Sequence, residues 1–262
     1  MSRARRIGEE VGPILAGIGG LLLVWAVVAA IVDSPSLPAP LEVWRAFLDG
    51  MRDGSIPEAA AKTLIRLAFS FAVAIVVGTA IGFAMALNEF FRRAIRPIIV
   101  ALQIAPPIAW LPLAVIWFGL NERAVVFVAI VGAFPSVTLG TMSAFRQVPP
   151  LLTRAGMTLG AQGWELYRSV IFPAALPGYV AGLQQAWGFA WKSLMAGELI
   201  VTGVQATGLG QLLALNQEGV QDVPALLAVV AVIVAIGTAV DYLVFNQLDR
   251  RVRARRGLLV QD

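Results

Sequence analysis

Long, unbroken apolar runs are the feature that most limits how this chain can fold. The run "LAFSFAVAIVVGTAIGFAMAL", from Leu67 to Leu87, contains no charged residue. A helix that crosses a bilayer needs about 20 mostly apolar residues, whereas a membrane β-strand alternates apolar and polar residues over about ten. The run does not alternate, and the chain is 58% hydrophobic and only 14% charged. We therefore expect an all-α polytopic membrane protein.

Several apolar segments of this length predict about six transmembrane helices in one domain, residues 1–262. The first segment is long and shows no small-residue cleavage pattern before Asp33, so we interpret it as an uncleaved span. Between the first two spans, "LEVWRAFLDGM" has apolar residues at helical spacing and predicts an amphipathic helix on the membrane surface. The predicted spans are 13–32, 61–87, 98–120, 124–145, 174–200 and 224–245.

The arginines predict the orientation of these spans. Cytoplasmic flanks of membrane helices are enriched in Lys and Arg, so the formal net charge of +4 is interpreted as topogenic rather than as a nucleic-acid surface. This rule places both termini and the 146–173 loop in the cytoplasm. The arginines on that side are Arg3, Arg5, Arg6, Arg92, Arg93, Arg96, Arg146, Arg154, Arg168 and the cluster 250–256.

The chain contains no cysteine and no histidine, which excludes disulfides, thiol chemistry and imidazole metal ligands. Ser193 beside Lys192 is a weak catalytic pair, because adjacent positions on a helix point apart. No GxxxxGK[ST] phosphate loop is present in the sequence. We expect a chain that is not an enzyme and that holds no metal or cofactor of its own.

The segment "GAQGWELYRSVIFPAALPG", Gly160 to Gly178, interrupts the apolar runs and predicts two helical pieces hinged at Gly160. Trp164, Tyr167 and Ile171 fall on one helical face. A helix this short is marginal in water, so its apolar face needs a cover. The membrane surface and a groove on a soluble partner are both possible covers.

This loop resembles the coupling motif, the EAA loop, of ABC importer permeases. The matching positions read 154–156 (Arg-Ala-Gly), Gly160, and 170–173 at the hydrophobic-proline end. Arg154 stands where the family has glutamate, and Gly156 replaces the second alanine. The stretches "LPAPLEVW", "IAPPIAWLPLAVIWFGLNE" and "AGELI…TGLG" resemble the nitrate/sulfonate/taurine class, so the resemblance covers nearly the whole chain.

The resemblance implies a type I ABC importer permease fold, with a cytoplasmic coupling-helix loop between spans four and five. It further implies cytoplasmic ATPase subunits that bind ATP and Mg, a second permease copy in a homodimer, an external substrate-binding protein, and a prokaryotic plasma (inner) membrane. The transported solute would be a small organic or inorganic anion such as a sulfonate, taurine or nitrate. The implied ATPase-coupling residues are Arg154, Ala155, Gly156, Gly160, Trp164, Glu165, Tyr167, Arg168 and Pro173.

Polar residues inside the predicted spans are candidates for the substrate pathway, because such residues usually face a cavity or a partner. Lys192 either attracts an anionic substrate or pairs with a neighbouring helix, and for Glu198 the pairing interpretation is favoured. Arg66 is expected to snorkel to the interface rather than bind substrate. The candidate pathway residues are Gln103, Trp110, Gln184, Gln185, Trp187, Lys192 and Glu198.

Two further patterns leave alternatives open. Small residues recur every four positions at 74–86 and 178–190, which favours close helix packing within the chain over a dimer interface. The alternative function is an ATP-independent secondary transporter or channel. That class is typically built from internal repeats with buried titratable relays, and the sequence shows no internal repeat.

Overall fold

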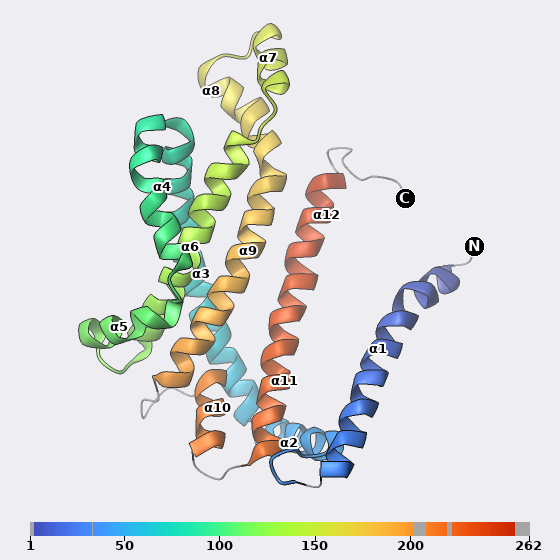
Figure 1. Cartoon of the computed structure of the whole chain (residues 1–262). Helices are drawn as coiled ribbons and strands as arrows, with labels where there is room; N and C mark the ends of the chain where they lie inside the picture. Colours follow the sequence, from blue (N-terminus) through green and yellow to red (C-terminus); the bar gives the residue numbers. More distant parts are fainter. Residues whose placement is uncertain (1–2, 33, 202–207, 219–221, 255–262) are drawn as a thin grey trace.

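The computed structural model describes residues 3–32, 34–201, 208–218 and 222–254, and these form helices joined by turns, with no strand (Figure 1). Thr207 of "TGLG" and Arg255 and Arg256 of the basic tail lie outside the described residues. This all-helical architecture confirms the predicted fold class.

Three long helices form the centre of the molecule: α3 (Ser55–Leu87), α6 (Glu122–Arg146) and α9 (Phe172–Ile200), with α6 packed against both others. The small-residue stripes lie at these contacts. A Cβ built on Gly78 would lie 2.7 Å from the Cβ of Val137, and one built on Gly140 would lie 2.9 Å from the Cα of Gly182. The stripes therefore serve packing within the chain, as their spacing favoured.

The segment expected as the third span is not one continuous helix. It consists of α4 (Glu89–Ile104), a 3-10 turn η1 (Pro107–Trp110) and α5 (Leu111–Phe118), and the two helical parts are bent by 100°. Proline disfavours helical backbone in the residue before it, and Ala105 and Pro106 are extended, with ψ of 126° and 129°. The adjacent prolines 106 and 107 therefore end α4 and turn the chain sideways.

The remaining helices border this centre. α1 (Arg3–Val32) leads to α2 (Pro40–Arg52), which crosses the end of the bundle, and α10 (Leu209–Glu218) lies at the same end (Figure 1). α11 (Val223–Val240) leads away from α2 and continues through a π-helical turn, η3 (Asp241–Phe245), into α12 (Asn246–Ala254). Helix α2 is amphipathic, as expected: Val43 is buried whereas the charged residues Glu42, Arg45 and Asp49 are exposed.

Three helices among the described residues are long and apolar enough to cross a membrane: α3, α6 and the continuous stretch Val223–Ala254. The bent pair of α4 and α5 adds a fourth if it counts as one crossing. Helix α9 has 29 residues, which is about 44 Å at 1.5 Å per residue and long enough to span a bilayer core. Helix α9 carries Gln184, Gln185, Lys192 and Glu198 within its length.

A short helical elbow projects from the bundle at the end opposite α2 and α10 (Figure 1). It consists of α7 (Pro150–Thr158), α8 (Gly163–Leu166) and a π-helical turn, η2 (Tyr167–Ile171), which runs directly into α9. We call residues 150–171 the elbow. Its two helices flank Gly160, which matches the helix–glycine–helix arrangement expected from the sequence.

Candidate functional site

The turn of the elbow depends on two glycines. Gly160 has φ +93° and Gly163 has φ +51°, in the left-handed region that residues with a Cβ rarely adopt. The N–H of Gly160 donates to the carbonyl of Met157, and the N–H of Ala161 donates to the carbonyl of Gly156, which closes the end of α7. The backbone itself thus fixes the angle between α7 and α8.

Gly156 sets how closely α7 lies against the rest of the elbow. It is buried, and a Cβ built on it would lie 2.8 Å from Cγ2 of Val170 and 3.0 Å from Cδ1 of Leu166. Both contacts are shorter than ordinary van der Waals distance. Glycine at this position therefore lets α7 pack against η2 more tightly than alanine would.

The elbow exposes large apolar side chains although it projects from the bundle. Leu159 is 89% exposed and Trp164 is 67% exposed. Exposed apolar side chains gathered on a projecting segment mark a site of interaction with a protein or with the membrane surface. The apolar patch of the elbow consists of Leu151, Leu152, Met157, Leu159 and Trp164.

Trp164 and Tyr167, expected on one shared face, have different surroundings. The Trp164 ring meets Phe172 edge-on at 5.9 Å and remains exposed on its other side. Tyr167 is half-buried, and its ring lies 6.5 Å from Phe83 of α3. Tyr167 thus anchors the elbow to the bundle, whereas Trp164 belongs to the exposed apolar patch.

The other candidate coupling residues lie on the elbow or directly after it. Pro173, the second residue of α9, follows the π-helical turn η2 and has no N–H to donate back into that turn. Arg154, Ala155, Glu165 and Arg168 are all exposed on the elbow. Their exposure leaves them available to a partner.

A groove of about 480 Å³ runs between α4, α6 and α9. Gln103 lines it and donates a hydrogen bond from its side-chain amide to the Ser136 hydroxyl, at 3.0 Å. Gln185 lines it from α9. The described residues around the groove include one cation and no carboxylate: Arg96, Val100, Gln103, Ser136, Leu139, Gly140, Met142, Ser143, Ala144, Gln147, Gly178, Ala181, Gly182 and Gln185.

The other candidate pathway residues on α9 lie in two kinds of surroundings. Lys192 is exposed on the surface of the isolated chain. Gln184 instead turns toward α11–α12 and donates to Oδ1 of Asp241 at 3.1 Å, and Trp187 stacks on Trp191 at 6.0 Å in the core. In η1, Trp110 has a buried Nε1 with no hydrogen-bond partner among the described residues.

Glu198 is completely buried and forms the centre of a polar network. Its carboxylate accepts hydrogen bonds from Nη1 of Arg66 at 2.7 Å, from the Thr63 hydroxyl, and from the backbone N–H of Gly210 at 3.0 Å. Arg66 also bonds Oε1 of Glu122 at 2.7 Å. We call Thr63, Arg66, Glu122 and Glu198 the Glu198 network; it joins α3, α6, α9 and α10.

The expectation that Arg66 snorkels to the interface is wrong. Its side chain is only 6% exposed and is held between two carboxylates. Sequence reasoning missed this pairing because 132 positions separate Arg66 from Glu198, and no local pattern links them. Asp241, the partner of Gln184, was also missed, although an acidic residue at the end of an apolar run is a visible signal.

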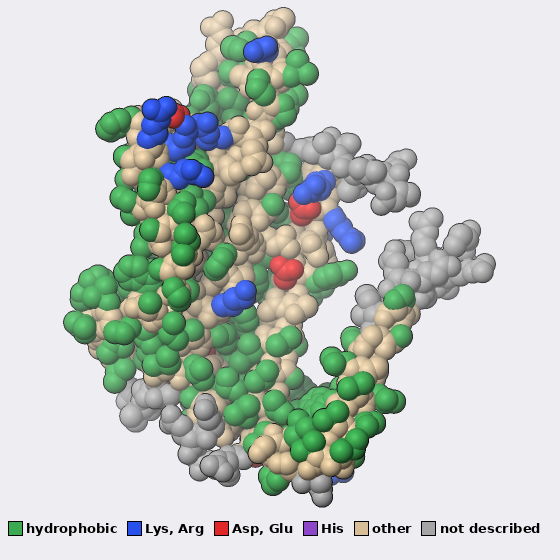
Figure 2. Space-filling view, viewed as in Figure 1, with side chains coloured by type: hydrophobic (Ala, Val, Ile, Leu, Met, Phe, Trp, Pro, Cys, Tyr) green, Lys and Arg blue, Asp and Glu red, His purple; other side chains and the backbone are tan. Residues whose placement is uncertain are grey.

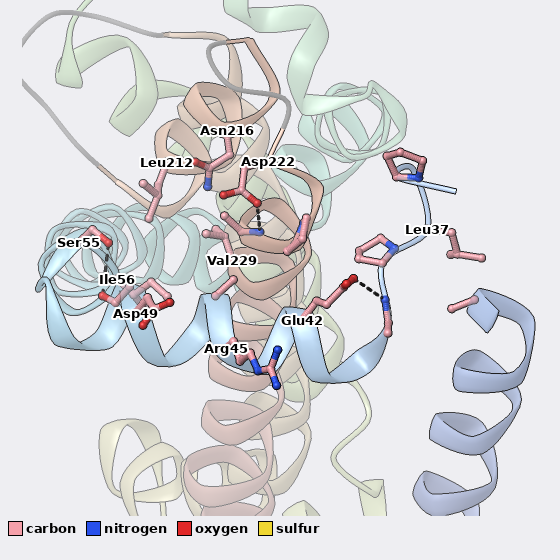
Figure 3. A pocket seen from close by; sticks show the side chains of 18 of the residues that line it. Leu37, Glu42, Arg45, Asp49, Ser55, Ile56, Leu212, Asn216, Asp222 and Val229 are labelled. Atoms are coloured by element: carbon pink, nitrogen blue, oxygen red, sulfur yellow. Dashed lines mark hydrogen bonds between the residues drawn. The ribbon is translucent and has the colours of Figure 1, made fainter. Parts of the chain in front are cut away.

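A cavity of about 1160 Å³ lies at the other end of the molecule, between α1, α2, α10 and α11 (Figure 3). Two of its acidic side chains serve as helix caps. Glu42 accepts from the N–H of Ala39 at 2.9 Å, and Asp222 accepts from the N–H of Ala225 at 3.0 Å. These carboxylates stabilise the starts of α2 and α11 rather than forming a binding cluster.

Comparison with known proteins adds to this geometry. The model of the family described as "Binding-protein-dependent transport system inner membrane component" matches residues 46–254. The chain is 31% identical to the taurine transport system permease protein TauC of Escherichia coli, over 96% of this chain and 92% of that protein. It is 29% identical to the bicarbonate transport system permease protein CmpB of Synechococcus elongatus, over 87% of this chain and 84% of that protein.

Solved structures show a related fold. An inward-facing structure of the MetNI methionine ABC transporter superposes with a TM-score of 0.61 at 22% identity, and it covers 76% of this chain and 95% of that chain. An amino acid ABC transporter crystallised with histidines superposes with a TM-score of 0.55 at 19% identity, over 80% of this chain and 98% of that chain.

Proposed function

Because the chain belongs to the family of binding-protein-dependent transport system inner membrane components, we propose that its groove conducts a small anion and that its elbow couples this step to ATP hydrolysis. The chain is a permease subunit of an ABC importer and a multi-pass inner membrane protein, not itself a catalytic subunit. The proposal concerns its substrate, its partners and the residues that act.

The observation that carries the proposal is the exposed apolar patch on the elbow. A short helix that presents leucine and tryptophan side chains away from its own bundle fits the helix-in-groove mode of recognition. Buried aromatic anchors supply much of the affinity at such interfaces. In our proposal a cytoplasmic ATPase subunit covers this patch, with the exposed residues Arg154, Ala155, Glu165 and Arg168 around its rim.

The elbow is built to transmit displacement. The η2 turn enters α9 without a loop, and Gly156 holds α7 closely against η2. Tyr167 contacts Phe83 of α3, and Phe83 stacks on Phe172 of α9 at 5.4 Å. In our proposal, closure of the ATPase subunits on ATP and Mg moves the elbow, which moves α3 and α9 and changes the side to which the groove opens.

The lining of the groove favours an anion. Amides and hydroxyls solvate an anion without a fixed opposite charge, and Arg96 adds one positive charge at the groove. Lys192 is exposed in the single chain, and a charged side chain in a membrane helix requires a water-filled cavity or a partner. A second copy of the chain would place Lys192 in a pathway shared by the two copies. Each copy would cross the membrane six times, with both termini in the cytoplasm. Glu198 and Trp187 would shape this pathway from within the bundle.

The proposal is tested with the permease assembled with its ATPase subunits and its external substrate-binding protein in proteoliposomes. ATP hydrolysis is measured against a panel of anions (a sulfonate, nitrate and bicarbonate), with choline as a cationic control. We expect at least one anion to stimulate hydrolysis. Stimulation by choline and by none of the anions would contradict the proposed substrate class.

A further inference from the structure

A dense basic patch lies at the elbow end of α4, apart from the elbow itself. Figure 2 shows Lys and Arg side chains gathered over this part of the molecule, with a single acidic side chain among them. The cluster consists of Arg92, Arg93 and Arg96 on the first turns of α4 and Arg146 at the end of α6. Three of these four arginines, Arg92, Arg93 and Arg146, form ion pairs with the one carboxylate of Glu89.

The hydrogen-bond donors of this cluster outnumber its acceptors. The carboxylate of Glu89 pairs with the guanidinium of Arg92 and accepts a hydrogen bond from Nε of Arg93 at 2.8 Å. Nη1 of Arg146 lies 3.6 Å from the same carboxylate. The hydrogen bond from Arg93 and the charges of Arg92 and Arg93 lower the pKa of Glu89, so this carboxylate stays ionised at neutral pH. Even so, Nη1 of Arg92 is buried and has no hydrogen-bond partner among the described residues. A buried, unpaired guanidinium donor is costly and calls for a further acceptor.

A cavity of about 580 Å³ lies directly against these arginines. It is lined by Glu89, Arg92, Arg93, Arg96, Pro97 and Val100. Planar guanidinium groups match the oxygens of a phosphate group in bidentate geometry. The polar part of the cavity is therefore suited to a phosphate that pairs with the positive charge not balanced by Glu89.

The neighbouring face of α4 is apolar and open. Phe90 is 83% exposed, Ile98 is 56% exposed and Ile104 is 76% exposed. At about 100° per residue around the axis of α4, Phe90 and Ile104 fall on the side next to Arg93, whereas Ile98 falls on the side away from Arg96. A free phosphate ion would make no use of Phe90 and Ile104, whereas a ligand with both a phosphate and hydrocarbon chains would cover the cavity and these two side chains together.

We propose that this cavity binds the headgroup of an anionic phospholipid. The phosphate is held by Arg92, Arg93 and Arg96, and the acyl chains lie along Phe90 and Ile104. Basic clusters at the ends of membrane helices attract anionic lipids, and a cavity lined by three arginines and one carboxylate gives this attraction a defined site. The proposal does not depend on which solute the groove carries.

The structure supplies a matched control. Arg250 and Arg251 lie on α12, are exposed, and carry the same charge as Arg92 and Arg96. Replacing two arginines by glutamine in either place removes the same formal charge. Only the α4 replacement removes donors that line the cavity.

The test is native mass spectrometry of the full-length chain in detergent, titrated with phosphatidylglycerol and, separately, with phosphatidylcholine. We expect Arg92→Gln with Arg96→Gln to weaken phosphatidylglycerol binding about tenfold or more, on the order expected for two lost charges near a headgroup. Arg250→Gln with Arg251→Gln should leave binding within about twofold of the parent chain. Glu89→Gln should tighten binding, because it removes the carboxylate that competes for the same arginines.

Several results would overturn the proposal. Equal loss of phosphatidylglycerol binding in the α4 and α12 double variants would show that only the total positive charge of the chain matters. Equal retention of phosphatidylcholine, or displacement of bound lipid by inorganic phosphate at the same concentration, would show that the site does not select an anionic lipid. Unchanged lipid binding in the α4 variant together with loss of co-purifying ATPase would assign the arginines to a protein partner. If Arg92→Gln with Arg96→Gln fails to fold, phosphatidylglycerol binding by Glu89→Gln still tests the proposal, and unchanged or weaker binding by that variant would contradict it.

Discussion

Glu198 lies where α3, α9 and α10 meet. Its carboxylate accepts hydrogen bonds from Thr63 and Arg66 of α3 and from the backbone N–H of Gly210 at the start of α10. A Cβ built on Gly208 would lie 2.4 Å from Oε1 of Glu198, so the small residues around this carboxylate let the backbone approach it closely. A buried ion pair contributes little net stability when fully satisfied, but removing one partner leaves a buried charge without compensation. The network therefore fixes the arrangement of these helices more than it adds to stability.

Replacing Glu198 should be strongly destabilising. We expect Glu198→Ala to lower the free energy of unfolding by about 3–5 kcal/mol, because Arg66 keeps its buried charge and has only Glu122 as a partner. Chemical unfolding of the purified chain in detergent measures this change.

The matching control is Arg66→Met with Glu198→Leu, which removes both charges and fills the space. This double variant should recover most of the lost stability. If it is less stable than Glu198→Ala, the Glu198 network is not acting as a charge pair.

Lys192 is the single residue on which the proposed anion pathway depends most. Lys192→Ala should lower uptake of the anionic solute about tenfold, since one favourable charge interaction of this order is lost, whereas Lys192→Arg should retain most uptake. The measurement is uptake into proteoliposomes by the assembled importer, with co-purification of the ATPase as a check of assembly. Normal uptake by Lys192→Ala would place this lysine outside the pathway.

At the scale of elements, the elbow combines a rigid attachment with an exposed apolar patch. Tyr167 holds the elbow to the bundle and Gly156 packs α7 against the rest of the elbow, while Leu159 and Trp164 face outward. Substitutions on the two sides of the elbow should therefore have separable effects.

The outward side should govern binding of the ATPase. We expect Leu159→Ser with Trp164→Ser to abolish co-purification of the ATPase and to leave the thermal stability of the permease unchanged, because these side chains are exposed in the free chain. Trp44→Ser on α2 is the matched control, since Trp44 is 56% exposed at the opposite end of the molecule. Retention of the ATPase by the Leu159/Trp164 variant would remove the elbow as its docking site.

The sequence predicted helices well wherever a long apolar run or a glycine–proline pattern acts locally. It located α3, α6 and the two-part elbow, because hydropathy and backbone preferences depend on neighbouring residues. It did not predict the 100° bend between α4 and α5, since prolines within membrane helices are often tolerated without a break. Contacts between distant segments, such as Arg66 with Glu198 and Tyr167 with Phe83, depend on tertiary packing and leave no local signal.

On the scale of the whole molecule, the elbow and α2 lie at opposite ends of the helical bundle (Figure 1). If the elbow is cytoplasmic, α2 must lie on the outer side. The chain has no native cysteine, so a single introduced cysteine reports its own position.

Impermeant thiol labelling tests this orientation. Cysteine at Leu159, which is 89% exposed, should react only in inside-out vesicles and should be shielded when the ATPase is bound. Cysteine at Leu41 on α2, which is 57% exposed, should react only from the outside of intact cells. The reverse pattern would invert the proposed topology.

The most direct test of the coupling mechanism is uptake of the stimulating anion into proteoliposomes, with and without the ATPase subunits and ATP. We predict uptake against a gradient only when both are present, and none when the permease carries Leu159→Ser with Trp164→Ser. Equal solute movement by the permease alone would contradict the coupling role of the elbow.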